Sequence, residues 1–181
     1  MDMNKNLSLW RLTAALILGL ASTLATAKGK PELVGWIEQL AFEDQDGNPV
    51  VVKGKLDTGA KTSSIYATSI ERFKRKGKRW VRFDLMLKTL DGKIVRVPME
   101  RKLVRSVRIK EHKHKNNRRA VVMLDFCLGN QTHSAQFTLA DRSKFNYPVL
   151  MGRRFLAGKF AIDPSRTYVT PLACEPVATD E

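Results

Sequence analysis

The 181-residue chain is poor in residues that bind metals, with two cysteines and three histidines. Cys127 and Cys174 are too far apart in sequence to indicate a metal pair. There is no His-Glu-x-x-His motif, and His112, His114 and His133 fall in or near expected turns, where two imidazoles without a third ligand make a weak site. No glycine-rich phosphate loop ending in Lys-Ser/Thr is present. We therefore predict no metal, no cofactor and no use of ATP.

Acidic residues are also scarce. The chain has 18 Asp and Glu against 32 Lys and Arg, a formal net charge of +14. Such an excess attracts anions, among them acidic peptides, anionic envelope polymers and lipid headgroups. No sequence motif of a nucleic-acid-binding fold is present, so nucleic acid is not an expected partner. Peripheral contact with an anionic membrane surface fits the same charge.

The first 27 residues have the three parts of a secretory signal. Lys5 and Arg11 supply the positive start, residues 12–20 the apolar core, and Ala25–Ala27 a small-residue end. The apolar run is short for a membrane span, although an uncleaved anchor is the alternative. We expect an exported, periplasmic protein with one domain over residues 28–172 and a flexible tail over residues 173–181.

Export also bears on the two cysteines. In an oxidising compartment Cys127 and Cys174 can form a disulfide that ties the tail to a core strand. The alternative is that Cys127, which lies in an apolar run, is a small buried core residue. The sequence leaves both open.

Apolar and polar residues alternate along most of the chain, which indicates a mainly β protein. Asp91-Gly92 is the strongest hairpin signal, and Gly129 begins a second clear turn. We expect one short helical turn after Gly152, a second over residues 70–74 and a terminal hairpin around residues 164–166. The expected strands are 33–42, 50–56, 80–87, 93–98, 120–128, 135–140 and a short one ending at Gly152.

The Asp57-Thr58-Gly59-Ala60 turn is the first candidate site. It follows an apolar strand, so the carboxyl group of Asp57 is placed at a strand end where backbone N–H groups can reach it. Asp and Gly also favour ordinary turns, and the tripeptide alone is weak evidence for chemistry.

Three further blocks make the indication specific: Asp141-Arg142-Ser143, Pro148–Arg153 and Asp163–Arg166. With Lys55–Ser63, and in this order, they resemble a bacterial family of retropepsin-like aspartic endopeptidases long labelled ATP-dependent zinc proteases. The resemblance covers residues 33–170. It implies a closed retropepsin-like β-barrel forming a single domain with one short helix.

The resemblance also implies an activity, the hydrolysis of peptide bonds by two aspartates that share one proton. This chain has one Asp-Thr-Gly motif, so the pair would come from Asp57 of two chains in a homodimer. By the family pattern Asp57 is the catalytic carboxyl, Thr58 holds the two turns in register, and Gly59 lets the backbones approach. Ala60 leaves room for substrate beside them.

Basic residues near these blocks are candidates for substrate binding. Lys61, Arg153, Arg154 and Arg166 could hold acidic peptides, and the association of such families with glutamate-adding ligases suggests glutamate-containing ones. For Asp163 and Arg166 a structural ion pair that closes a turn is the alternative. The basic segment 110–119 is expected to be either a solvated loop or a substrate-covering flap.

Lys61 stands where many retropepsins carry an acidic residue, and a cation there would oppose the shared-proton state. The second hypothesis is accordingly an inactive module of the same fold that binds acidic peptide or envelope polymer.

Overall fold

The computed structural model describes residues 29–108 and 118–174. The predicted signal, most of the basic segment 110–119 and residues 175–181 lie outside these ranges. The described chain is mainly β with one short helix, as expected. No helix in the described ranges is long and apolar enough to cross a membrane. The elements are β1 (Glu32–Glu43), β2 (Pro49–Asp57), β3 (Ser63–Arg75), β4 (Lys78–Lys88), β5 (Ile94–Lys102), β6 (Arg105–Arg108), β7 (Arg118–Leu128), β8 (Gln131–Ala140), β9 (Val149–Gly152), α1 (Arg153–Leu156) and β10 (Phe160–Thr167).

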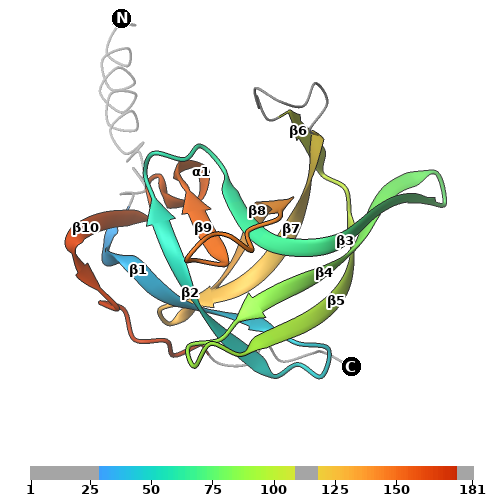
Figure 1. The fold of residues 1–181 in the computed structure, drawn as a ribbon. Helices are drawn as coiled ribbons and strands as arrows, with labels where there is room; N and C mark the ends of the chain where they lie inside the picture. The colour runs from blue at the N-terminus through green and yellow to red at the C-terminus, as the bar shows by residue number, and fades with distance from the viewer. Residues whose placement is uncertain (1–28, 109–117, 175–181) are drawn as a thin grey trace, which may run out of the picture.

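Six strands close into a barrel in the order β1-β2-β9-β3-β8-β7 (Figure 1). The last pair joins β7 to β1 at Cys127 and Ala41, which completes the circuit. Two further strands pair with the barrel without being part of it: β10 pairs with β1, and β6 pairs with β7. Closure removes free edges from the barrel strands, so their backbone groups are paired within the wall. The predicted closed barrel is confirmed.

The barrel interior is the hydrophobic core, and the period-two alternation of the strands fills it. On β7, Val122, Leu124 and Phe126 are buried while Met123 and Asp125 between them are exposed. An aromatic cluster lies at the centre of the core, with Phe126 against Phe42, Phe137 and Phe155 at ring-centroid distances of 5.2–5.7 Å. Neighbouring aromatic rings at these distances stabilise the packing beyond their area alone.

β3 and β4 continue past the barrel as a long curled hairpin, which β5 extends (Figure 1). The helical turn predicted over residues 70–74 is therefore wrong. A bulge at Ser69, whose φ is +52°, shifts the register of β3, and the strand then pairs with β4 as far as Arg75. Across the hairpin the Arg75 guanidinium lies 4.7 Å from the Trp80 ring centroid. These cross-strand contacts outweigh the local charge pattern.

The terminal hairpin predicted around residues 164–166 is also wrong. Residues 160–167 form one strand, β10, parallel to β1, with a register shift between Gly35 and Ile37. Asp163 accepts hydrogen bonds from the Ser165 backbone N–H and hydroxyl at 2.9 and 2.6 Å. The turn residues thus make an irregularity inside a strand because β1 pairs with the segment on both sides of them.

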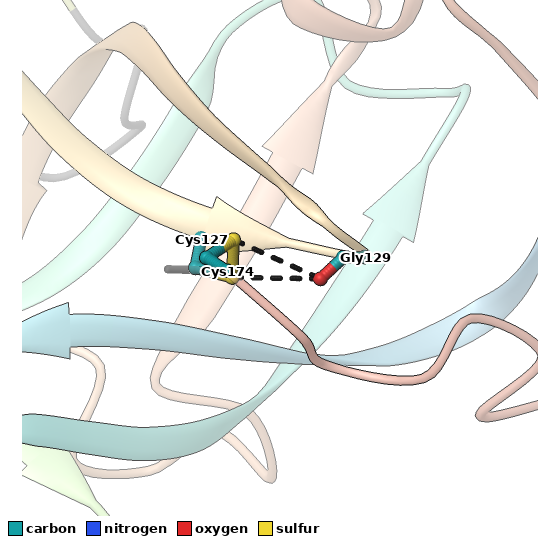
Figure 2. Close-up of a disulfide and its surroundings, with 3 residues drawn as sticks. All are labelled: Cys127, Gly129 and Cys174. Atoms are coloured by element: carbon teal, nitrogen blue, oxygen red, sulfur yellow. Dashed lines mark hydrogen bonds between the residues drawn. A yellow bond between two sulfur atoms is a disulfide. The ribbon is translucent and has the colours of Figure 1, made fainter. Parts of the chain in front are cut away.

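The disulfide that the sequence left open is present, between Cys127 on β7 and Cys174 (Figure 2). Both sulfur atoms also lie within 3.7 Å of the Gly129 carbonyl oxygen, and the Ala173 N–H donates to the same oxygen at 2.8 Å. Ala173 and Cys174, assigned to a flexible tail by the sequence, are therefore attached to the β7–β8 turn.

Candidate active site

Asp57 is the last residue of β2, and β2 pairs in parallel with β9, so that Asp57 lies opposite Gly152. Its Oδ1 accepts hydrogen bonds from the backbone N–H of Gly59 at 2.9 Å and of Ala60 at 3.2 Å. The turn therefore holds the carboxylate in one orientation, with 24% of the side chain exposed. Thr58 and Gly59 are exposed at the tip of the turn and Ala60 is half-buried.

Glycine is required where β9 meets this turn. A Cβ on Gly152 would lie 2.5 Å from the Thr62 carbonyl carbon and 2.8 Å from the Thr62 nitrogen. The contact is with backbone, which cannot move aside as a side chain can. A Cβ on Gly59 would lie 3.1 Å from Asp57 Oδ1, a tighter contact than usual. The close approach explains why both sequence blocks carry a glycine.

Backbone hydrogen bonds join the two blocks, which are far apart in sequence. The Arg153 N–H donates to the Ala60 carbonyl at 2.9 Å, and the Arg154 N–H to the Lys61 carbonyl at 3.2 Å. The Gly152 N–H donates to the Ser63 hydroxyl oxygen at 3.1 Å in a buried bond. The start of α1 and the segment after the Asp-Thr-Gly turn are thus one unit.

Lys55 is a site residue that sequence reasoning gave no role. Its Nζ lies 3.5 Å from Asp57 Oδ2, and 39% of the side chain is exposed. The two residues are separated by one position on β2, so their side chains share a face of the strand. That period-two spacing was the signal available in the sequence. Among the described residues the cation paired with this carboxylate is Lys55, and the exposed Lys61 forms no ion pair with it.

Arg142 is the second residue that sequence reasoning missed, although its Asp-Arg-Ser block was part of the resemblance. Only 8% of it is exposed, and it donates to Ser64 Oγ at 2.9 Å and to the Tyr147 carbonyl at 3.0 Å. Burial and then the positive charge of Arg119 lower the pKa of Arg142, while the negative charge of Asp57 raises it. Its guanidinium therefore lies within the electrostatic reach of the candidate carboxylate.

The other predicted binding residues fall into two groups. Arg153 and Arg154 are exposed on α1, next to the Asp57 turn through the backbone bonds above. Arg166 is exposed on β10, which β1 separates from β2. The expected ion pair between Asp163 and Arg166 is not formed. Asp163 instead accepts hydrogen bonds from Ser165, which lower its pKa more than the charge of Arg166 does. The site therefore gathers all the predicted residues except Arg166.

The histidine that the structure describes is part of the core wall. His133 is half-buried on β8, with its ring 5.4–5.9 Å from the rings of Phe126, Phe155 and Phe160. His112 and His114 lie outside the described residues. Within the described ranges no three residues of the His, Cys, Asp and Glu types come together as a metal site.

β6 and β7 are the arms of an antiparallel hairpin in which Arg108 pairs with Arg118. Residues 109–117, between the arms, lie outside the described ranges, so the flap stays a prediction.

A closed barrel in which an Asp-Thr-Gly turn meets an apolar strand ending in Gly defines the retropepsin-like class of aspartic endopeptidase. Within that class, the chain belongs to the RimB-like family, described as retropepsin-like aspartic endopeptidase RimB, whose family model matches residues 33–172.

The chain also resembles curated proteins named "Probable alpha-L-glutamate ligase". It is 34% identical to the one from Shewanella pealeana over 117 residues, which is 65% of this chain and 25% of that protein. It is 30% identical to the one from Desulfotalea psychrophila over 134 residues, 74% of this chain and 28% of that protein. The chain thus spans about a quarter of the length of these relatives.

A crystal structure of similar fold is that of Lpg0085 from Legionella pneumophila, a protein described as having unknown function. It superimposes with a TM-score of 0.62 at 30% identity, covering 77% of this chain and 98% of that one.

Proposed function

We propose that the protein is an aspartic-type endopeptidase whose catalytic pair consists of Asp57 from each of two chains. The observation that carries this proposal is the Asp57 carboxylate, partly exposed at a strand end and held by the N–H groups of Gly59 and Ala60. Aspartic proteolysis needs two carboxyl groups that lie close enough to share one proton. Each chain supplies one Asp-Thr-Gly turn, and therefore one of the two groups. A two-fold axis at the turn tip brings the two carboxyl groups together.

In this mechanism one Asp57 accepts a proton from the attacking water while the other donates a hydrogen bond to the scissile carbonyl. Oδ1 is held by the turn, so Oδ2 is the oxygen that faces away from these two donors. Thr58 is exposed at the tip, where its hydroxyl would bond to the partner turn. Gly59 would keep that approach open, because it adds no side chain between the two turns.

Acidic peptides, glutamate-containing ones in particular, are the proposed substrates. Ala60 gives space beside the carboxylate, and Lys61, Arg153 and Arg154 surround the turn with exposed positive charge. Arg166 would act only on a longer substrate, since it lies two strands away from β2. Relatives that carry a similar segment are named for glutamate ligation. An endopeptidase related to them would cleave the bonds between acidic residues.

Export to the periplasm is part of the proposal. The Cys127–Cys174 disulfide supports it, because disulfides persist in oxidising compartments. An uncleaved N-terminal anchor would leave the barrel in the same compartment, and the positive charge would let it contact an anionic membrane surface.

One observation favours the second function, a non-catalytic module that binds acidic peptide or envelope polymer. Lys55 Nζ lies 3.5 Å from Asp57 Oδ2, so the carboxylate already has a cationic partner within its own chain. Such a module would need the basic surface and would not need Asp57.

Cleavage of defined peptides distinguishes the two functions. Peptides with a run of glutamates and matched peptides with a run of lysines are incubated with the protein from about pH 4 to about pH 7, a range that spans the ordinary pKa values of carboxyl groups and of histidine. We expect cleavage of the glutamate peptides by wild type and by Asp125→Asn, an exposed control on β7, and none by Asp57→Asn. Binding without cleavage in all three proteins would favour the module.

A further inference from the structure

A hollow of about 350 Å³ lies on the outer face of β7 and β8, beside α1. Met123, Ser134 and Gln136, which line it, alternate with core residues and are exposed on their strands. Neither Asp57 nor the Thr58–Ala60 turn lines the hollow. It is therefore separate from the Asp57 turn itself, although Arg154 belongs to both places.

The charged groups in this hollow are all cations. Arg105 from β6, Arg154 from α1 and Lys159 line it, and no Asp or Glu does. Burial lowers the pKa of the Arg105 guanidinium, and the positive charge of Arg154 lowers it further. Like charges held together without a counter-charge favour an anion between them.

The Arg105 side chain is fixed by one hydrogen bond and has a further nitrogen donor that is not used. Its Nε donates to Gln136 Oε1 at 2.9 Å, which fixes the plane of the guanidinium. Its Nη2 is buried, and no acceptor within the described chain bonds to it. A buried charged N–H without an acceptor is costly. Arg105 also lines the hollow, so an anion bound there would offset part of the cost of its buried charge.

We propose that this hollow binds a small oxyanion carrying two negative charges, held by Arg105, Arg154 and Lys159. Two guanidinium groups and an ammonium suit the oxygens of a phosphate group or of a compact dicarboxylate, which present the same chemistry here. The volume is near the lower end of the range for small-molecule sites, which fits a ligand of this size.

The site is connected to the Asp57 turn. Thr62 and Ser63 also line the hollow, and the Ser63 hydroxyl accepts from the Gly152 N–H at 3.1 Å. The Arg154 N–H donates to the Lys61 carbonyl. An anion bound by the Arg154 side chain would therefore hold in place the segment that leads out of the Asp-Thr-Gly turn. This consequence holds whether or not the turn is catalytic.

Isothermal titration of the purified full-length protein tests the proposal, with inorganic phosphate in one arm and glutarate in the other, in buffer with sodium chloride to screen the overall charge. We expect saturable one-to-one binding in at least one arm, at least tenfold weaker in both Arg105→Gln and Arg154→Gln. The matched control is Arg108→Gln, which removes the same charge from an exposed position on the same strand and does not line the hollow.

The arm that binds identifies the ligand chemistry, phosphate or dicarboxylate. Thermal unfolding of the ligand-free variants shows that they fold, and Arg154→Gln, on an exposed position of α1, keeps the test available if Arg105→Gln is unstable. Binding in neither arm, or equal weakening in Arg108→Gln and the two hollow variants, would overturn the proposal.

Discussion

Gly152 lies opposite Asp57 in the parallel register of β2 and β9, and a Cβ at Gly152 would lie 2.5 Å from the Thr62 carbonyl carbon. This one pairing sets the position of the candidate carboxylate, because the strand carrying Gly152 also binds Ser63 and precedes α1. The turn of Asp57 and the strand of Gly152 therefore act as a single structural unit.

Gly152→Ala should lower the free energy of unfolding by about 3 kcal/mol, the upper end of the usual cost of overpacking, because the methyl group meets backbone. Urea denaturation measures it. Gly29→Ala is the control, since a Cβ at Gly29 meets nothing within 4 Å. Equal stabilities of the two variants would contradict the close approach of β9 to Thr62.

Reduction of the Cys127–Cys174 disulfide should destabilise the protein by up to about 4 kcal/mol, the loop-closure estimate for a sequence separation of 47. Urea unfolding with and without dithiothreitol gives the difference. A variant with both cysteines replaced by alanine should match the reduced protein and show no response to the reductant. A wild type that is indifferent to dithiothreitol would refute the stabilising role of the bridge.

Arg142→Met should lower the free energy of unfolding by about 1–3 kcal/mol, since it removes the hydrogen bonds to Ser64 and Tyr147 and leaves two half-buried acceptors unpaired. Lys144→Met removes one positive charge from an exposed neighbouring position and should change stability little. Chemical denaturation of both variants is the measurement. If Lys144→Met were as destabilising, the loss would reflect charge and not the two bonds.

His133 should make the protein less stable as the pH falls. Burial and then the charge of Lys159 lower its pKa, with the Leu128 backbone opposing them. The unfolded chain therefore takes up a proton near its ordinary pKa of about 6.5 while the folded chain does not, so stability is lost from about that pH downwards.

The free energies of unfolding of wild type and His133→Phe measure this contribution. They are compared from about pH 7.5 to about pH 5, a range that spans the ordinary pKa of histidine. The variant should lose less stability on acidification than wild type. The carboxyl groups with lowered pKa values, such as Asp44, Asp84 and Asp141, titrate at more acidic pH and do not mask it. Parallel pH profiles would show that His133 is not the group responsible.

Much of the fold could be predicted because local signals and tertiary structure agree. Asp91-Gly92 marks the hairpin that the structure places between β4 and β5, and alternation along residues 120–128 gives the buried face of β7. The predictions failed where distant partners decide: β4 makes a strand of residues 70–74, and β1 keeps residues 160–167 extended.

The candidate site shows the same division. The Asp57 turn and the Gly152 strand carry recognisable motifs, so the sequence identifies both. Arg142 looks like an exposed charge in a loop, and only the fold buries it between Ser64 and Tyr147. The ion pair of Lys55 with Asp57 agrees with strand spacing, but the same alternation places Lys53 on that face as well, so the spacing alone does not identify the partner.

Mixing wild type with Asp57→Asn shows whether two chains share one catalytic pair. The two proteins are equilibrated in equal amounts, the molar mass is determined by light scattering, and cleavage of a glutamate peptide is followed in the same sample. A shared pair predicts a dimer whose activity per wild-type chain falls to about half, because half of the wild-type chains then have an inactive partner. A cleaving monomer, or unchanged activity per wild-type chain in the mixture, would contradict it.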